Sequence, residues 1–239
     1  DWEFGVFYET TTNDLINDEL DGRDLSSSNT YREFKRGFSF GGPIIKDRLF
    51  LFAAYEESDE PRFLAYGPAG SGGEERDWLS QSDYQRILDI IDENYGFDPG
   101  GTPENGAQTT ESYLVRLDWN ITDRHSIAGI YNFYDGSQDR LSDSDPNEFE
   151  FSNHGYVKGS ESETYTAIID SQWTDALSTQ IYYSDSRMND SQVTVGPKDI
   201  GDHQIEIGRF PNQNVIYVGA DDSRQANRLY TDSSLLKLS

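Results

Sequence analysis

The sequence predicts an all-β protein: a segment of an antiparallel, up-and-down transmembrane β-barrel with long extracellular loops, one of which contains a short helix. Short segments alternate apolar and polar residues with a period of two, as strands with one apolar face do. Their connections alternate between short and long, as the periplasmic turns and extracellular loops of outer-membrane barrels do. Aromatic residues make up 13% of the chain and gather near strand ends, a position that membrane interfaces favour for Tyr and Trp.

The composition of the 239 residues excludes several classes of protein. Lys and Arg total 19 against 44 Asp and Glu, and the net charge of −25 argues against nucleic-acid binding, which needs a basic face. The abundance of aromatic residues argues against disorder. Cysteine is absent, which excludes a disulfide framework. No apolar run reaches the roughly 18 residues of a transmembrane helix, so a membrane span would have to be a barrel strand.

The first strand is predicted over residues 1–9, where apolar and polar residues alternate. Its apolar face consists of Trp2, Phe4, Val6 and Tyr8, and Phe7 is the one exception on the other face. A polar, acidic loop over residues 11–31 follows. The next strand places Phe34, Phe38 and Phe40 on one side. Each of these two strands therefore has one apolar face.

Residues 38–55 (FSFGGPIIKDRLFLFAAY) are typical of a hairpin with a short connection. Gly permits backbone conformations with positive φ, and Pro cannot donate a hydrogen bond to a neighbouring strand. The periplasmic turn is predicted at Gly41, Gly42, Pro43, Lys46 and Asp47. The return strand over residues 49–55 is apolar on both faces, which predicts lipid on one side and protein on the other.

A long insertion over residues 57–110 contains the signature of a helix of about three turns. Ser82 with Gln85 three residues later forms a capping-box pattern, and Gly96 is placed to end the helix. The apolar stripe at helical spacing consists of Tyr84, Ile87, Leu88 and Ile91. We expect this stripe to pack on a loop or on the rim of the barrel.

The rest of the chain continues the alternation of hairpins and long loops. Hairpins are predicted over residues 113–134 and 164–184, loops over residues 135–160 and 185–226, and a final strand over residues 229–239. The last loop contains two short strand patterns, at residues 205–208 and 215–219. The total is about eight strands of about ten residues each, a length that suits a membrane-spanning strand.

Aromatic residues near the strand ends predict the two membrane interfaces. They are Trp2, Tyr8, Tyr55, Trp119, Tyr134, Trp173 and Tyr183. Strands in general are also rich in Tyr and Trp, and the asymmetry of the loops is what favours the membrane interpretation. Arg116 and Asp118 point away from the apolar face of their strand, toward the lumen of a barrel, where they could contact a plug or solute. Structural pairing with neighbouring polar strands is the favoured role.

No catalytic constellation is apparent, and no cofactor is expected. His125, His154 and His203 lie in separate connections, and none has a partner at a meaningful spacing. The sequence contains no nucleophile elbow, P-loop or metalloprotease helix. Asp139, Asp143 and Asp145 are candidate calcium ligands. They lack the spacing and the glycine of an EF-hand loop, so a solvated acidic loop is the favoured explanation.

Four stretches carry a resemblance to a known family. They are GGPIIKDRLFLFAAYEE (41–57), YGFDPG (95–100), SYLVRLDWNITDRHSIAGIYNFY (112–134) and VGADDSRQANRLYTDSSLLKLS (218–239). Together, and in this order, they resemble the barrel of TonB-dependent outer-membrane receptors, in particular the Oar-like subgroup. The resemblance implies that residues 1–239 are the N-terminal third of a barrel of about 22 strands, without the plug domain and the remaining strands.

Such a receptor binds a scarce ligand outside a Gram-negative cell and imports it across the outer membrane. The implied partners are outer-membrane lipid, the rest of the barrel and its plug domain, the TonB-type energy-coupling complex, which acts through the plug, and an extracellular ligand. The leading hypothesis is therefore a transporter segment and not an enzyme. The alternative is a secreted or cell-surface acidic β-rich protein with a binding or structural role, with calcium as a candidate ligand.

Overall fold

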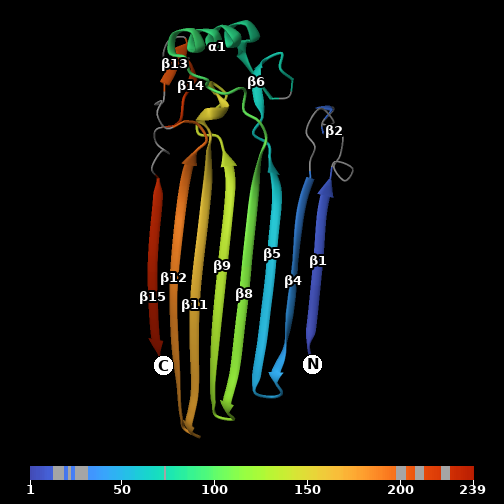
Figure 1. Cartoon of the computed structure of the whole chain (residues 1–239), viewed down its shortest axis with the longest axis vertical. Coiled ribbons are helices and arrows are strands. Elements are labelled where there is room, and N and C mark those ends of the chain that lie inside the picture. Colours follow the sequence, from blue (N-terminus) through green and yellow to red (C-terminus); the bar gives the residue numbers. More distant parts are fainter. Residues whose placement is uncertain are drawn as a thin grey trace.

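The main body of the molecule is an eight-stranded antiparallel sheet whose strands follow one another in chain order (Figure 1). The computed structural model describes residues 1–12, 19–20, 23–24, 32–72, 74–197, 203–207, 213–221 and 227–239. The sheet strands are β1 (Glu3–Thr12), β4 (Arg32–Ile45), β5 (Leu49–Arg62), β8 (Gly106–Thr122), β9 (His125–Arg140), β11 (Tyr156–Thr174), β12 (Leu177–Thr194) and β15 (Arg228–Leu238). This order confirms the predicted up-and-down arrangement.

The short connections gather at one end of the sheet and the long ones at the other (Figure 1). The turn between β4 and β5 comprises Lys46, Asp47 and Arg48, and Asp47 has a φ of 60°. Gly42 pairs with Leu51 inside the sheet, so the prediction that Gly41, Gly42 and Pro43 form the turn is wrong. The glycine serves packing instead: a Cβ on Gly42 would lie 2.5 Å from the indole ring of Trp2.

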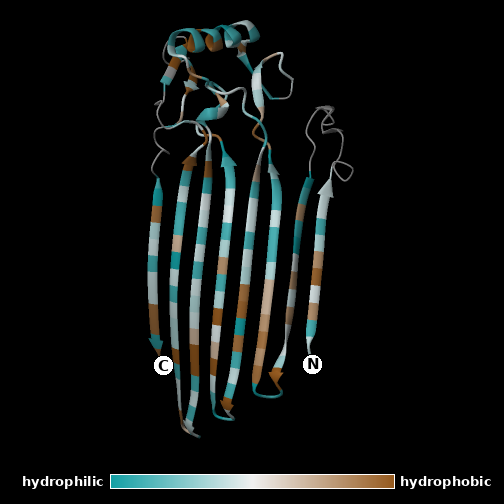
Figure 2. Ribbon diagram, viewed as in Figure 1, coloured by the Kyte–Doolittle hydropathy of each residue, from teal (hydrophilic) through white to brown (hydrophobic). Residues whose placement is uncertain are grey.

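Six of the strands are 14–19 residues long and extend well beyond the predicted ten. The added residues are mostly polar, and Figure 2 shows that hydrophobic residues concentrate toward the short-turn end of the sheet. Cross-strand hydroxyl pairs continue the ladder in the polar part, for example Ser58 with Thr110 at 2.7 Å and Thr109 with Ser137 at 2.9 Å. The alternation of apolar and polar residues in the sequence therefore predicted only the apolar part of each strand and missed its polar extension.

The long connections carry a second set of elements, which we call the loop cap. It consists of β6 (Tyr66–Ala69), β7 (Glu74–Ser80), α1 (Gln81–Tyr95), β10 (Glu148–Glu150), η2 (Ser152–His154), β13 (His203–Ile207) and β14 (Asn214–Val218). Strands β10, β14 and β13 form a three-stranded sheet, and β6 pairs with β7. Strands β13 and β14 confirm the two predicted short strands. The predicted loop 11–31 lies mostly outside the described residues and includes the paired strands β2 (Glu19–Leu20) and β3 (Arg23–Asp24).

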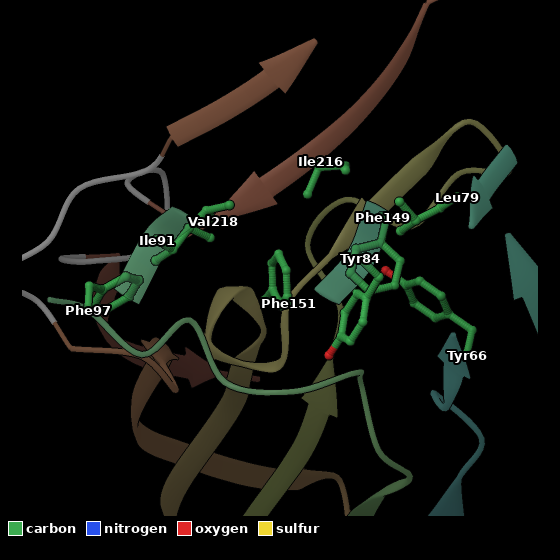
Figure 3. Packing of buried hydrophobic residues seen from close by; sticks show 9 residues of the cluster. All are labelled: Tyr66, Leu79, Tyr84, Ile91, Phe97, Phe149, Phe151, Ile216 and Val218. Carbon is green, nitrogen blue, oxygen red and sulfur yellow. The ribbon is translucent and has the colours of Figure 1, made fainter. Parts of the chain in front are cut away.

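The hydrophobic core lies in the loop cap, not in the sheet (Figure 3). Its members come from all three long connections that follow β5, β9 and β12: Tyr66, Leu79, Tyr84, Ile91, Phe97, Phe149, Phe151, Ile216 and Val218. Phe149, Phe151 and Ile216 have no exposed surface. The ring of Tyr84 packs edge-on against Phe149 and stacks on Phe151, with centroids 5.7 and 5.6 Å apart. The three connections thus fold as one unit.

Helix α1 packs on this core through the predicted stripe, since Tyr84 and Ile91 are buried and Ile87 and Leu88 lie against the cluster. Its N-cap is Ser80 and not Ser82, because the Ser80 hydroxyl accepts a hydrogen bond from the Asp83 amide at 3.1 Å. Gly96 ends the helix with a φ of 60°, as predicted. Within the described residues, no helix combines the length and apolar character of a membrane span.

Candidate functional site

One face of the sheet carries a continuous band of apolar side chains that crosses all eight strands. We call it the apolar band; it consists of Phe4, Val6, Phe38, Phe40, Leu51, Ala53, Tyr55, Tyr113, Val115, Leu117, Trp119, Ile127, Tyr131, Phe133, Tyr165, Ala167, Ile169, Ile181, Tyr183, Leu236 and Leu238, which strand register places on one side. Phe4 and Val6 are 70% exposed and Leu117 is 41% exposed. An apolar surface of this extent marks a membrane or protein contact.

The opposite face, which we call the inner face, is hollowed and richer in polar residues than the apolar band, although Phe7, Leu114 and Tyr134 also lie on it. A hollow of about 550 Å³ lies over it, and Ser39, Glu56, Ser112 and Asn132 are among its lining residues. A second hollow, of about 1020 Å³, is lined by residues from three hairpin turns, which shows that the short-turn end of the sheet curves around a space. The sheet is therefore an arc with an apolar outer side.

Arg116 and Asp118 lie on the inner face and bind each other. The guanidinium donates two hydrogen bonds of 2.7 Å to the carboxylate, so the residues pair with each other and not, as predicted, with neighbouring strands. Both charges are thus paired within their own strand.

The apolar band ends in charged residues on its long-connection side. Arg36 forms an ion pair with Glu57, and the Tyr55 hydroxyl donates to Glu57 and to Glu111, the latter at 3.0 Å. Lys35 pairs with Glu56 on the inner face at 3.0 Å. A tyrosine at the junction of apolar and charged surface has its ring on the apolar side and its hydroxyl on the polar side, as interface tyrosines do.

A polar cluster of Asp143, Glu150 and His154 lies in the loop cap, next to core residues because Glu150 stands between Phe149 and Phe151 in the chain. The His154 Nδ1 lies 2.8 Å from the Gly219 carbonyl oxygen, and its Nε2 lies 3.0 Å from an oxygen of Asp143. Both ring nitrogens therefore face acceptors, an arrangement that is satisfied when the ring carries both protons. His154 links the connection after β9 to the one after β12.

Glu150 has no exposed surface and accepts backbone hydrogen bonds from Ser142 and Asp143 at 2.9–3.1 Å. Burial disfavours the charged form and raises the pKa of Glu150 to about 7, although these backbone donors and His154 oppose the shift. The Glu150 amide donates to the Tyr66 hydroxyl at 2.8 Å. Glu150 thus joins the connections after β5 and β9.

The cluster could also hold a metal ion, since Asp143, Glu150 and His154 each offer one ligand atom and these atoms lie within 4.8 Å of one another. The Gly219 carbonyl would then orient the imidazole, as backbone carbonyls commonly do for metal-bound histidine. The hydrogen bonds already give each of the three side chains a partner, so the arrangement is complete as a structural brace.

Comparison with known proteins identifies the fold. No protein-family model and no curated protein matches the chain. Among solved structures, the chain is similar to the outer membrane transporter YddB from Escherichia coli, with a TM-score of 0.58 and 12% sequence identity. The fold is that of a partial outer-membrane β-barrel. The match covers 99% of this chain and 27% of the transporter, so this barrel segment spans about a quarter of its length.

Six of the seven aromatic residues predicted for the interfaces lie on the face of the apolar band: Trp2, Tyr8, Tyr55, Trp119, Trp173 and Tyr183. Tyr134 points to the inner face, where its ring lies over Gly136. Phe133 occupies the band instead and stacks on Tyr113 with centroids 5.0 Å apart. Aromatic residues at consecutive positions left the choice of face open in the sequence. Contact of these residues with lipid remains a prediction.

The candidate calcium ligands do not form one group in the structure. Asp139 accepts a hydrogen bond from the Ala107 amide at 2.7 Å, and Asp143 belongs to the cluster with Glu150 and His154. The expectation that His154 lacks a partner is wrong. The Glu150-to-His154 spacing of four residues was visible, but outside a helix that spacing does not imply contact. His125 lies at the start of β9, with its ring 5.1 Å from that of Trp173.

Proposed function

We propose that this chain is a segment of a TonB-dependent outer-membrane receptor of the Oar-like subgroup, which captures a solute outside a Gram-negative cell and imports it. The proposal is carried by the two-faced sheet, with its continuous apolar band on one side and its hollowed polar inner face on the other. In lipid, only closed backbone hydrogen bonding is tolerated, and a barrel wall with this polarity meets that condition.

The two sheet edges support a larger barrel. Strands β1 and β15 each pair on one side only within the described sheet, and their other backbone edges are open. An open edge invites pairing with further strands. We propose that strands elsewhere in the complete protein close the barrel, and that a plug domain fills the lumen against the inner face and contacts the energy-coupling complex.

In this arrangement the loop cap lies outside the cell and shapes the entrance to the lumen. Its own core and its polar cluster hold three connections in one arrangement, which suits a preorganised binding surface. Transport and not catalysis is the proposed role of the barrel segment.

Fractionation of cells that express the complete protein tests the membrane assignment. We expect recovery in the outer-membrane fraction, resistance to alkaline carbonate and solubility only in detergent. Recovery in the soluble periplasm or the medium without detergent would refute the proposal and favour the secreted acidic β-rich alternative.

A binding assay tests the coupling. The complete protein in detergent should bind the purified periplasmic domain of the host's TonB-type protein, and deletion of the proposed plug should abolish that binding. Equal binding with and without the plug would contradict the proposed route of energy coupling.

A further inference from the structure

A cavity of about 330 Å³ lies between the inner face of the sheet and the loop cap. The sheet contributes Arg62 at the end of β5 and Arg140 at the end of β9, opposite Tyr156. Strand alternation places Arg62 on the same side as Ala54 and Glu56, which is the inner face. The cavity therefore opens to the lumenal side of the barrel segment, near the long connections.

Positive charge concentrates in this cavity although the chain is strongly acidic. Among the described residues that line it are three arginines, Arg62, Arg76 and Arg140, and one carboxylate, that of Glu74. The whole chain has only 19 Lys and Arg against 44 Asp and Glu. A cluster of cations in such a background creates a local field that favours an anion.

Arg76 forms the back wall of the cavity and already has its partners. It is 5% exposed and donates to the carbonyl oxygens of Glu148 and Ser144 at 2.8 and 2.9 Å. It also pairs with Glu74 at 2.8 Å and stacks 4.1 Å over the ring of Tyr66. Arg76 is thus held in place by the loop cap and adds charge to the wall.

Unlike Arg76, the side chains of Arg62 and Arg140 form no ion pair with any residue that the structure describes. The Nε atom of Arg62 is buried and has no hydrogen-bond partner among the described residues. Arg140 donates from Nε to Gln138 at 2.6 Å, which orients its guanidinium, and its terminal nitrogens form no hydrogen bond with any residue in the described part of the chain. A buried donor without a partner is unfavourable, and a bound acceptor would satisfy it.

We propose that Arg62 and Arg140 bind an oxyanion group, a carboxylate or a phosphate, of the solute that enters the barrel. The planar guanidinium fork matches both groups in bidentate geometry. Leu64 and Tyr156 also line the cavity and supply apolar surface for the carbon skeleton next to the charge. The volume is at the lower end of small-molecule pockets, which suits one oxyanion with a few attached carbons. This inference rests on the proposed function for its biological meaning.

Calorimetric titration of the complete protein in detergent with inorganic phosphate and with succinate tests the site, and the two probes distinguish phosphate from carboxylate. We expect millimolar or tighter binding of at least one probe. Arg62→Gln and Arg140→Gln should each weaken that binding at least tenfold, and Arg62→Lys should weaken it less than Arg62→Gln. Arg124→Gln, which removes an exposed arginine paired with Asp175 at the short-turn end, should leave binding unchanged.

Unchanged thermal unfolding of each variant shows that a loss of binding comes from the site. Absence of binding of both probes by the wild-type protein, or equal affinity for wild type and the Arg62→Gln, Arg140→Gln double variant, would overturn the inference. A protein that fractionates with the outer membrane but binds neither probe would refute the oxyanion site alone. A protein recovered in soluble form that binds an anion through these arginines would refute the membrane proposal alone.

Discussion

Replacement of Leu117 by lysine is the most direct test of the apolar band. Leu117 lies on β8 between Leu51 of β5 and Gly129 of β9. The segment from Tyr113 to Ile121 has nine residues, about the number with which a tilted barrel strand spans the hydrocarbon core, and Leu117 is at its middle. A lysine at the bilayer midplane costs about 2–4 kcal/mol, so the folding equilibrium should shift roughly 30- to 700-fold.

The assay is folding of the complete protein into phosphatidylcholine vesicles, followed by gel mobility and tryptophan fluorescence across a urea series. The matched control is Leu114→Lys on the same strand. Leu114 points to the inner face and lines its hollow, away from the proposed lipid contact. The expected change for this control is smaller than that for Leu117→Lys, because the lysine lies on the inner face and not in hydrocarbon.

The comparison of the two variants decides the result. If both lysines destabilise the folded protein equally, the two faces do not differ in environment and the outward orientation of the band is refuted. If Leu117→Lys has no effect in vesicles, the band does not face lipid. The same pair in cells should give reduced outer-membrane levels for Leu117→Lys only.

Three further predictions concern the loop cap. Phe149→Ala should destabilise the cap by about 3–5 kcal/mol because Phe149 has no exposed surface, and hydrogen exchange of the β10 and β14 amides should rise while the sheet stays protected. Ser80→Ala should weaken the cap of α1 by about 1 kcal/mol, measured as faster proteolysis near the helix, and Ser82→Ala should have less effect. Folding raises the pKa of Glu150 from 4.5 to about 7, so between these pH values the folded loop cap binds more protons than the unfolded one. The free energy of unfolding of the loop cap should therefore fall by about 3 kcal/mol as the pH rises from 4.5 to 7. Glu150→Gln should remove most of this pH dependence in the same exchange measurement; an unchanged profile would contradict the assignment to Glu150.

The order of the strands and the face on which each side chain lies could be predicted from the sequence. Both depend on the alternation of apolar and polar residues within a short segment. Alternation of Phe4, Val6 and Tyr8 fixes which side chains share a face, and the pattern holds without knowledge of the partner strand. Strand ends were not predictable in the same way. The outer parts of β8 and β9 are rich in Thr, Ser and Gln, which lack an apolar side, and only the backbone ladder shows that they continue the sheet.

The loop cap could not be predicted because its contacts join residues that are far apart in the chain. Tyr66 meets Glu150 across 84 residues, and His154 reaches Gly219 across 65. What could have been deduced is where these contacts form. The connections after β5, β9 and β12 leave the same end of an up-and-down sheet from nearby strands, so their few aromatic and aliphatic residues have one place to be buried together. The buried cluster is therefore a consequence of the barrel topology, and the proposed arginine site lies where that cluster meets the inner face.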